Sequence, residues 1–156
     1  MPNKTIYLAS PYGFADQWKL KLLPEFITKL ESMGARVWEP FFRNSDIDLS
    51  NPGWAHKVAR SNFSDLKDAD GLFAIVNGTP PDEGVMVELG IAIALGKPTF
   101  LFRDDFRKCT DSEEYPLNLM IFLGIPADLW NDYYYSSLGE IDCKNKAIYK
   151  WLRNEI

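Results

Sequence analysis

A chain of 156 residues with 46% hydrophobic and 25% charged residues has the size and composition of one soluble domain with a sizeable core. Its formal net charge of −5, without any run of Lys and Arg, argues against nucleic-acid binding, and it has no stretch of about 18 apolar residues to cross a membrane. Two cysteines without a CxxC pair and a single histidine argue against a zinc site and a histidine-based triad. Together with the lack of a signal-peptide pattern, they predict a cytoplasmic protein.

The first half of the chain alternates between two predicted strands and two predicted helices. Residues 5–9 form a short apolar run closed by a turn, which is typical of a buried strand. Apolar residues recur at helical spacing over 14–33, where Pro24 predicts a kink or a late helix start. A second strand over 36–39 leads through a polar loop to a helix over 54–67.

The second half of the chain continues this alternation. Residues 70–76 are the clearest strand, because their continuous apolar character indicates burial on both faces, as in a parallel sheet. The other predicted elements are a loop over 77–83, a helix over 84–96, a strand over 99–102, a short helix over 117–122 and a last helix over 140–155. This order predicts one α/β domain over residues 1–156, with a doubly wound parallel sheet and helices on both faces.

Candidate site residues follow from the rule that open parallel sheets bind ligands beyond the carboxyl ends of their strands. The segments selected in this way are residues 10–14, 41–46, 77–88 and 103–120. Glu88 lies in an apolar helical segment, where an unpaired carboxylate is uncommon, so it is either a functional group or a paired or solvent-facing one. Asp82 precedes the same helix. Asp65 either points toward the strand ends or occupies a solvated surface position.

Carboxylates can cleave glycosidic bonds without a metal or an organic cofactor. One carboxylate attacks or stabilises an oxocarbenium-like carbon while a second acid protonates the leaving group. Glu88 and Asp82 are candidates for these two roles. The phosphate-binding patterns GxxxxGK[ST] and GxGxxG are both absent, which disfavours a kinase, an NTPase and a standard dinucleotide dehydrogenase. We therefore expect neither a metal nor a cofactor.

These residues resemble the nucleoside 2-deoxyribosyltransferases over most of the chain. The resemblance is most specific over residues 65–97, and it is reinforced near the N-terminus and again beyond residue 115. The matching residues are Asp82, Val87-Glu88-Leu89-Gly90, Ala94-Leu95-Gly96-Lys97, Ile6-Tyr7 and Pro116-Leu117-Asn118-Leu119-Met120. The resemblance implies a flavodoxin-like α/β fold and a double-displacement reaction on 2′-deoxynucleosides and free nucleobases.

The resemblance also implies a role for each matching side chain. Glu88 attacks C1′ of the deoxynucleoside, and Tyr7 holds its carboxylate by a hydrogen bond. Asp65 and Asp82 orient the base and supply or relay its proton. Two further residues lie on a segment that a neighbouring subunit donates, which implies a homo-oligomer with shared sites; they are Asn118 and Met120.

The loop after the second strand departs from the family pattern. The family has a polar glutamine there, and Asn44 is its candidate substitute in this chain. Tyr12 and Phe14 are among several aromatic residues near the strand ends that either sandwich the base or belong to the core.

Two alternative functions stay open. One is a 2′-deoxynucleoside 5′-monophosphate N-glycosidase, although this chain lacks the Gly- and Arg-rich first loop of those hydrolases and has Asn118 where they have serine. The other is a non-catalytic nucleotide-sensing module on the same fold.

Overall fold

The computed structural model describes residues 3–156 and contains a five-stranded parallel sheet with the order β2-β1-β3-β4-β5. The strands are β1 (Thr5–Ala9), β2 (Arg36–Trp38), β3 (Gly71–Ile75), β4 (Thr99–Phe102) and β5 (Tyr134–Tyr135). The strand β1, second from one edge of the sheet, pairs with β2 on one side and β3 on the other, with Tyr7 opposite both Trp38 and Leu72. This strand order is the flavodoxin-like one, so the expected doubly wound fold is confirmed.

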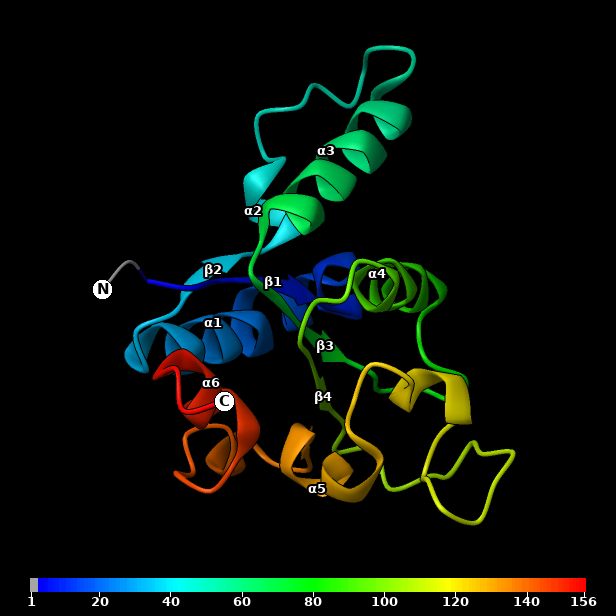
Figure 1. Cartoon of the computed structure of the whole chain (residues 1–156). Coiled ribbons are helices and arrows are strands. Elements are labelled where there is room, and N and C mark those ends of the chain that lie inside the picture. Colours follow the sequence, from blue (N-terminus) through cyan, green and yellow to red (C-terminus); the bar gives the residue numbers. More distant parts are fainter. Residues whose placement is uncertain (1–2) are drawn as a thin grey trace.

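Helices cover both faces of the sheet (Figure 1). They are α1 (Leu23–Ser32), α2 (Pro40–Arg43), α3 (Trp54–Asp68), α4 (Glu83–Ala94), α5 (Trp130–Tyr133) and α6 (Ala147–Leu152). Shorter helical turns occupy Pro11–Phe14, Trp18–Leu22, Leu119–Phe122, Ala127–Leu129 and Leu138–Glu140. Helix α3 projects away from the rest of the molecule (Figure 1), and its only buried residues are Asp65 and Leu66. Among residues 3–156, no helix is both long and apolar enough to span a bilayer.

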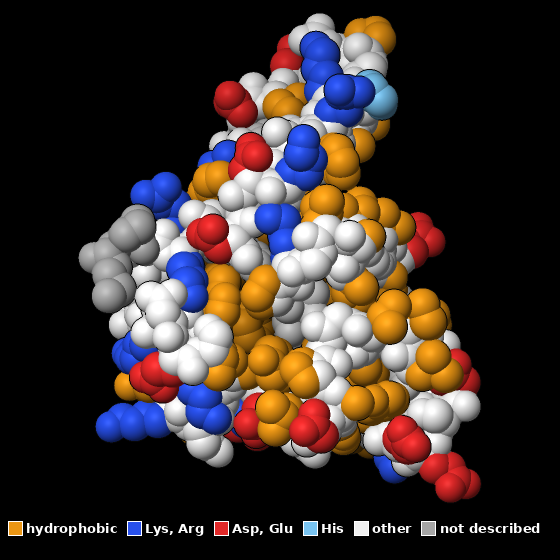
Figure 2. Space-filling view, viewed as in Figure 1, with side chains coloured by type: hydrophobic (Ala, Val, Ile, Leu, Met, Phe, Trp, Pro, Cys, Tyr) orange, Lys and Arg blue, Asp and Glu red, His pale blue; other side chains and the backbone are white. Residues whose placement is uncertain are grey.

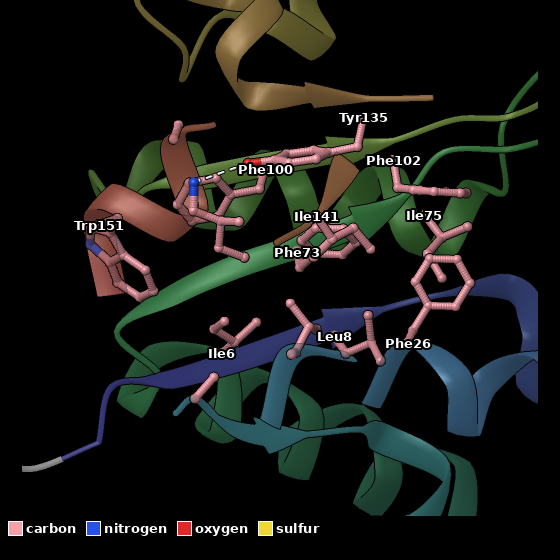
Figure 3. Packing of buried hydrophobic residues seen from close by; sticks show 14 of the residues in the cluster. Ile6, Leu8, Phe26, Phe73, Ile75, Phe100, Phe102, Tyr135, Ile141 and Trp151 are labelled. Atoms are coloured by element: carbon pink, nitrogen blue, oxygen red, sulfur yellow. Dashed lines mark hydrogen bonds between the residues drawn. The ribbon is translucent and has the colours of Figure 1, made fainter. Parts of the chain in front are cut away.

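The core is divided by the sheet into two layers. In the layer under α1 and α6, aromatic rings pack closely, with Phe26 edge-on to Phe102 at 4.7 Å between ring centroids. Figure 3 shows this layer, in which the buried hydroxyl of Tyr135 accepts a hydrogen bond from the backbone N–H of Ile148 at 3.0 Å. The opposite layer joins Tyr7 to α4 and to the last turn of α3. The side chain of Tyr7 therefore points toward the α3–α4 side of the sheet.

Several elements differ from the sequence-based expectation. Helix α2 lies where a polar loop was expected, and α5 was not expected, because both are too short to show a helical period. The helix expected over 14–33 is divided into a short turn, a π-helical turn and α1, which begins at Leu23 with Pro24 in its first turn, as a late start predicts. The two-residue strand β5 was not expected, because it is too short to show any periodicity. The last helix was expected over 140–155 but covers only α6.

The shortening of the last helix has a local cause at each end. Lys146 is extended, and its ammonium group donates to the carbonyl groups of Asn131 and Tyr134 at 2.8 and 2.7 Å, so the chain before it follows the edge of the sheet. At the other end Asn154 has φ of 58°, a left-handed conformation that terminates a helix.

Candidate active site

The centre of the candidate site is a hydrogen bond between β1 and α4. The hydroxyl of Tyr7 donates to Oε1 of Glu88 at 2.6 Å, which is the length of a bond to an ionised acceptor. Tyr7 is completely buried on β1, which is paired on both sides, so packing restricts the position of its ring. The structure therefore brings together the two residues that the sequence pairs as nucleophile and supporting hydroxyl.

Burial raises the pKa of Glu88 to about 7, and the negative charges of Asp82 and Glu39 act in the same direction. The hydrogen bond from Tyr7 opposes this shift because it stabilises the ionised carboxylate. The pKa of Tyr7 is itself raised, first by burial and then by the charge of Glu88, so its hydroxyl keeps its proton and remains a donor. A carboxyl group that titrates near neutrality is typical of a catalytic group.

Asp82 is held at the N-terminus of α4. Its Oδ1 accepts a hydrogen bond from the backbone N–H of Val85 at 3.0 Å, so the residue is the N-cap of the helix. Its charge contributes to the raised pKa of Glu88. Asp82 is therefore fixed beside the nucleophile candidate by the same helix that carries it.

Asp65 lies in the last turn of α3 and is paired with Arg43 at the end of α2. Nη2 of Arg43 lies 2.7 Å from Oδ1 of Asp65, and Nε of Arg43 donates to Oδ2, which makes the ion pair bidentate. The guanidinium also lies over the ring of Trp38, 4.3 Å from its centroid. Arg43 was not selected from the sequence, although it belongs to the segment that follows the second strand.

Asn44, the residue selected in that segment, is buried. Its side-chain nitrogen donates to the carbonyl of Pro40 and to Oδ1 of Asn62, both at 2.8 Å. Both of its amide hydrogens are thus used, one within α2 and one in connecting α2 to α3.

Glu39 is a further carboxyl group that sequence reasoning missed. It caps α2 by accepting the N–H of Phe42 at 2.9 Å, and it is 3% exposed. Its other oxygen, Oε1, is buried and has no hydrogen-bond partner within residues 3–156. Burial raises the pKa of this carboxyl group. Its place directly after the second strand was the signal that could have identified it.

The two predicted aromatic residues have different environments. Tyr12 is buried against Trp18 and Phe26, and its hydroxyl accepts a hydrogen bond from the side-chain amide of Asn77 at 2.7 Å. Phe14, in contrast, is 74% exposed and meets Phe41 edge-on at 5.1 Å. Phe14 is therefore open to a planar ligand, whereas Tyr12 packs in the core.

Asn118 and Met120 lie on the other side of α4 from Glu88. Asn118 caps the turn that contains Met120, because its Oδ1 accepts a hydrogen bond from the backbone N–H of Met120 at 3.0 Å. Met120 itself is 58% exposed. Both residues line an apolar hollow of about 640 Å³. Glu88 instead lines a groove of about 500 Å³ between α3 and α4. Within one chain, these two residues are thus separated from the Tyr7–Glu88 pair.

Comparisons with known proteins agree on one family. A sequence model described as nucleoside 2-deoxyribosyltransferase matches residues 6–120, a range that includes Tyr7, Glu88 and Asn118. A nucleoside deoxyribosyltransferase of Limosilactobacillus fermentum is 27% identical over 135 residues, which are 79% of this chain and 77% of that protein.

Solved structures give the same result. The 2-deoxyribosyltransferase of Bacillus psychrosaccharolyticus is 26% identical, with a TM-score of 0.67 over 88% of this chain and 89% of its own. The 2-desoxiribosyltransferase of Leishmania mexicana has a TM-score of 0.69 over 98% and 99% of the two chains. At 21% identity, that second likeness concerns the fold alone.

Proposed function

Because the chain belongs to the nucleoside 2-deoxyribosyltransferase family, we propose that it transfers the 2-deoxyribosyl group between nucleobases through a covalent intermediate on Glu88. The observation that carries this proposal is the 2.6 Å hydrogen bond from the Tyr7 hydroxyl to the Glu88 carboxylate. It orients one oxygen and leaves the other, Oε2, for attack on a carbon centre. No metal or organic cofactor takes part in the proposed reaction.

In the first half of the reaction, Oε2 of Glu88 forms a bond to C1′ of a 2′-deoxynucleoside. The bond between C1′ and the base nitrogen breaks, and its electron pair stays with the base. A proton then has to reach the departing base. Asp82 is the candidate donor, because it is fixed at the N-cap of α4, close enough for its charge to affect Glu88.

In the second half, a nitrogen of a different base attacks C1′ and the bond to Glu88 breaks, which restores the free carboxylate. The proton that this nitrogen loses returns to Asp82, so both carboxyl groups regain their starting states. The hydrogen bond from Tyr7 stabilises this carboxylate both before the first attack and after the second. The environment favours reaction at neutral pH, since a pKa of about 7 leaves a large ionised fraction while keeping the group reactive.

We also propose that the working site is shared between copies of this chain. Apart from Glu83 and Glu88, helix α4 consists of apolar residues and glycine on all sides, a pattern that is typical of a largely buried helix, yet Val87 is 63% exposed. Hydrophobic side chains also gather over α4 and the adjoining part of α3 in Figure 2. Phe63 of α3 lines the groove beside α4 and is 48% exposed. A second copy placed there would cover this apolar surface and could bring Asn118 and Met120 to the nucleophile.

The test is a transfer assay with thymidine as donor and hypoxanthine or adenine as acceptor. We expect the new deoxynucleoside to form, and we expect Glu88→Gln to lower its initial rate by about a thousandfold or more. The matched control is Glu31→Gln, which changes an exposed glutamate of α1 on the opposite face.

The outcomes separate the possible functions. Donor turnover without acceptor should add the mass of one deoxyribosyl group to the wild-type chain but not to Glu88→Gln. Free thymine without any new deoxynucleoside would indicate hydrolysis instead of transfer. Wild-type transfer in a folded Glu88→Gln variant would refute the covalent mechanism.

A further inference from the structure

The guanidinium of Arg43 has hydrogen-bond donors that Asp65 does not use. Its Nε–Nη2 edge faces Asp65, and one of its planar faces lies over Trp38. A guanidinium carries five N–H groups, and two of them are used in this ion pair. Nη1 has no hydrogen-bond partner among residues 3–156, and 39% of the side chain is exposed. The Nη1–Nη2 edge is therefore available to a ligand.

The guanidinium that carries this free edge lies near the Tyr7–Glu88 pair. Arg43 is placed by α2, which begins two residues after Trp38, and Trp38 lies opposite Tyr7 in the sheet register. The charge of Asp65 reaches the hydroxyl of Tyr7, where it contributes to the raised pKa of that group. The Arg43–Asp65 pair and the Tyr7–Glu88 pair are thus neighbouring parts of one polar cluster.

The residues next to Arg43 are less suited to recognising a base. Asn44 uses both amide hydrogens, one on Pro40 of α2 and one on Asn62 of α3. Asp65 has each of its two oxygens in a hydrogen bond to Arg43. Arg43 therefore offers exposed N–H donors of a permanently charged side chain, whereas the unpaired Oε1 of the neighbouring Glu39 is buried.

We infer that Arg43 recognises the nucleobase and selects bases whose edge carries two adjacent acceptors, as the O6–N7 edge of hypoxanthine and guanine does. A guanidinium matches this edge with two parallel hydrogen bonds, and the edge is remote from N9, where the sugar is attached. Adenine has an amino group at position 6, so it would place a donor against a donor. The inference rests on the proposed function in so far as the site receives a nucleobase.

Equilibrium binding of free hypoxanthine and free adenine tests this inference without requiring turnover. We expect calorimetry on the wild-type protein to give an affinity for hypoxanthine about tenfold to a hundredfold higher than for adenine. Arg43→Gln should abolish or reverse this preference, because a glutamine amide pairs with the N6–N7 edge of adenine. Arg43→Lys keeps the charge without the planar fork and should lose most of the preference.

The control is Arg36→Gln, at the exposed amino end of β2, which should keep the wild-type preference. Equal or weaker binding of hypoxanthine by the wild-type protein would overturn the inference, whether or not the variants fold. An unchanged preference in folded Arg43→Gln or Arg43→Lys would also overturn it. Selective binding without any transfer would refute the proposed function alone, whereas transfer without selectivity would refute the role of Arg43 alone.

Discussion

At the scale of single residues, the carboxyl group of Glu88 is under opposing influences. Burial and the charges of Asp82 and Glu39 raise its pKa to about 7, and the hydroxyl of Tyr7 lowers it. Only the ionised carboxylate can attack C1′. The proposed transfer should therefore increase as the pH rises through about 7 and then level off.

Tyr7→Phe removes the one interaction that lowers the pKa of Glu88. We expect the acidic limb of the kcat/KM profile to move to higher pH by about one unit, with a reduced plateau. Tyr149→Phe, on α6, is the matched control and should leave the profile in place. A midpoint that stays constant or moves to lower pH in Tyr7→Phe would contradict the assigned role.

Glu88 should also reduce stability at the pH where it is active. Its pKa is raised from the ordinary 4.5 to about 7, so the folded chain binds this proton more tightly than the unfolded chain does. The protonated carboxyl group contributes stability that is complete below pH about 4.5 and is lost as the pH rises through 7 and the group ionises.

Glu88→Gln cannot ionise and should therefore be more stable than the wild type at pH 8, by about 1–2 kcal/mol after allowance for partial solvent screening. At pH 4.5 the difference should be small. Urea unfolding of the wild type and the variant at both pH values measures this difference. A variant that is less stable than the wild type by the same amount at pH 4.5 and pH 8 would show that burial does not raise the pKa of Glu88.

At the scale of elements, Asp82 combines helix capping with the proposed proton transfer. Asp82→Asn keeps a good N-cap but cannot donate a proton, whereas Asp82→Ala loses both functions. We expect Asp82→Ala to lower the free energy of unfolding by about 1 kcal/mol and Asp82→Asn to leave it nearly unchanged. Both should slow transfer by about a hundredfold or more. Wild-type transfer by Asp82→Asn would exclude Asp82 as the proton donor.

The elements with strong patterns were predictable from the sequence. The three central strands are continuous apolar runs, and α4 is a long apolar segment that is followed by Gly96. The strand β5 was not predictable because two residues show no period. The start of α6 was not predictable because Lys146 is held by carbonyl groups 12 and 15 residues earlier in the chain. Local pattern identifies an element only where the element is long enough to show its own period.

The candidate site was predictable to a similar degree. Glu88 stands out as a carboxylate in an apolar helix, and the resemblance to the family supplies Tyr7 as its partner. Arg43 was missed because its role depends on an ion pair between α2 and α3, whose members are separated by 21 intervening residues. Two adjacent residues, Arg43 and Asn44, both bind side chains of α3, but only Arg43 keeps free donors, and the sequence does not distinguish them.

At the scale of the whole molecule, the site residues fall into two groups on opposite sides of α4. Glu88 lines the groove toward α3, and Asn118 lines the hollow on the other side. If copies of the chain share sites, then each working site takes Glu88 from one copy and Asn118 from another. Two variants that are each defective would then be able to complement each other.

We expect Glu88→Gln and Asn118→Ala to be far less active than the wild type when assayed separately. After the two are unfolded together and refolded as an equal mixture, activity should recover to about a quarter of the wild-type value, because half of random pairs are mixed and each holds one intact site of two. Glu88→Gln mixed with Asp82→Asn is the matched control and should not recover, since both residues come from the same copy. Recovery in the control pair, or none with Asn118→Ala, would show that sites are not shared in this way.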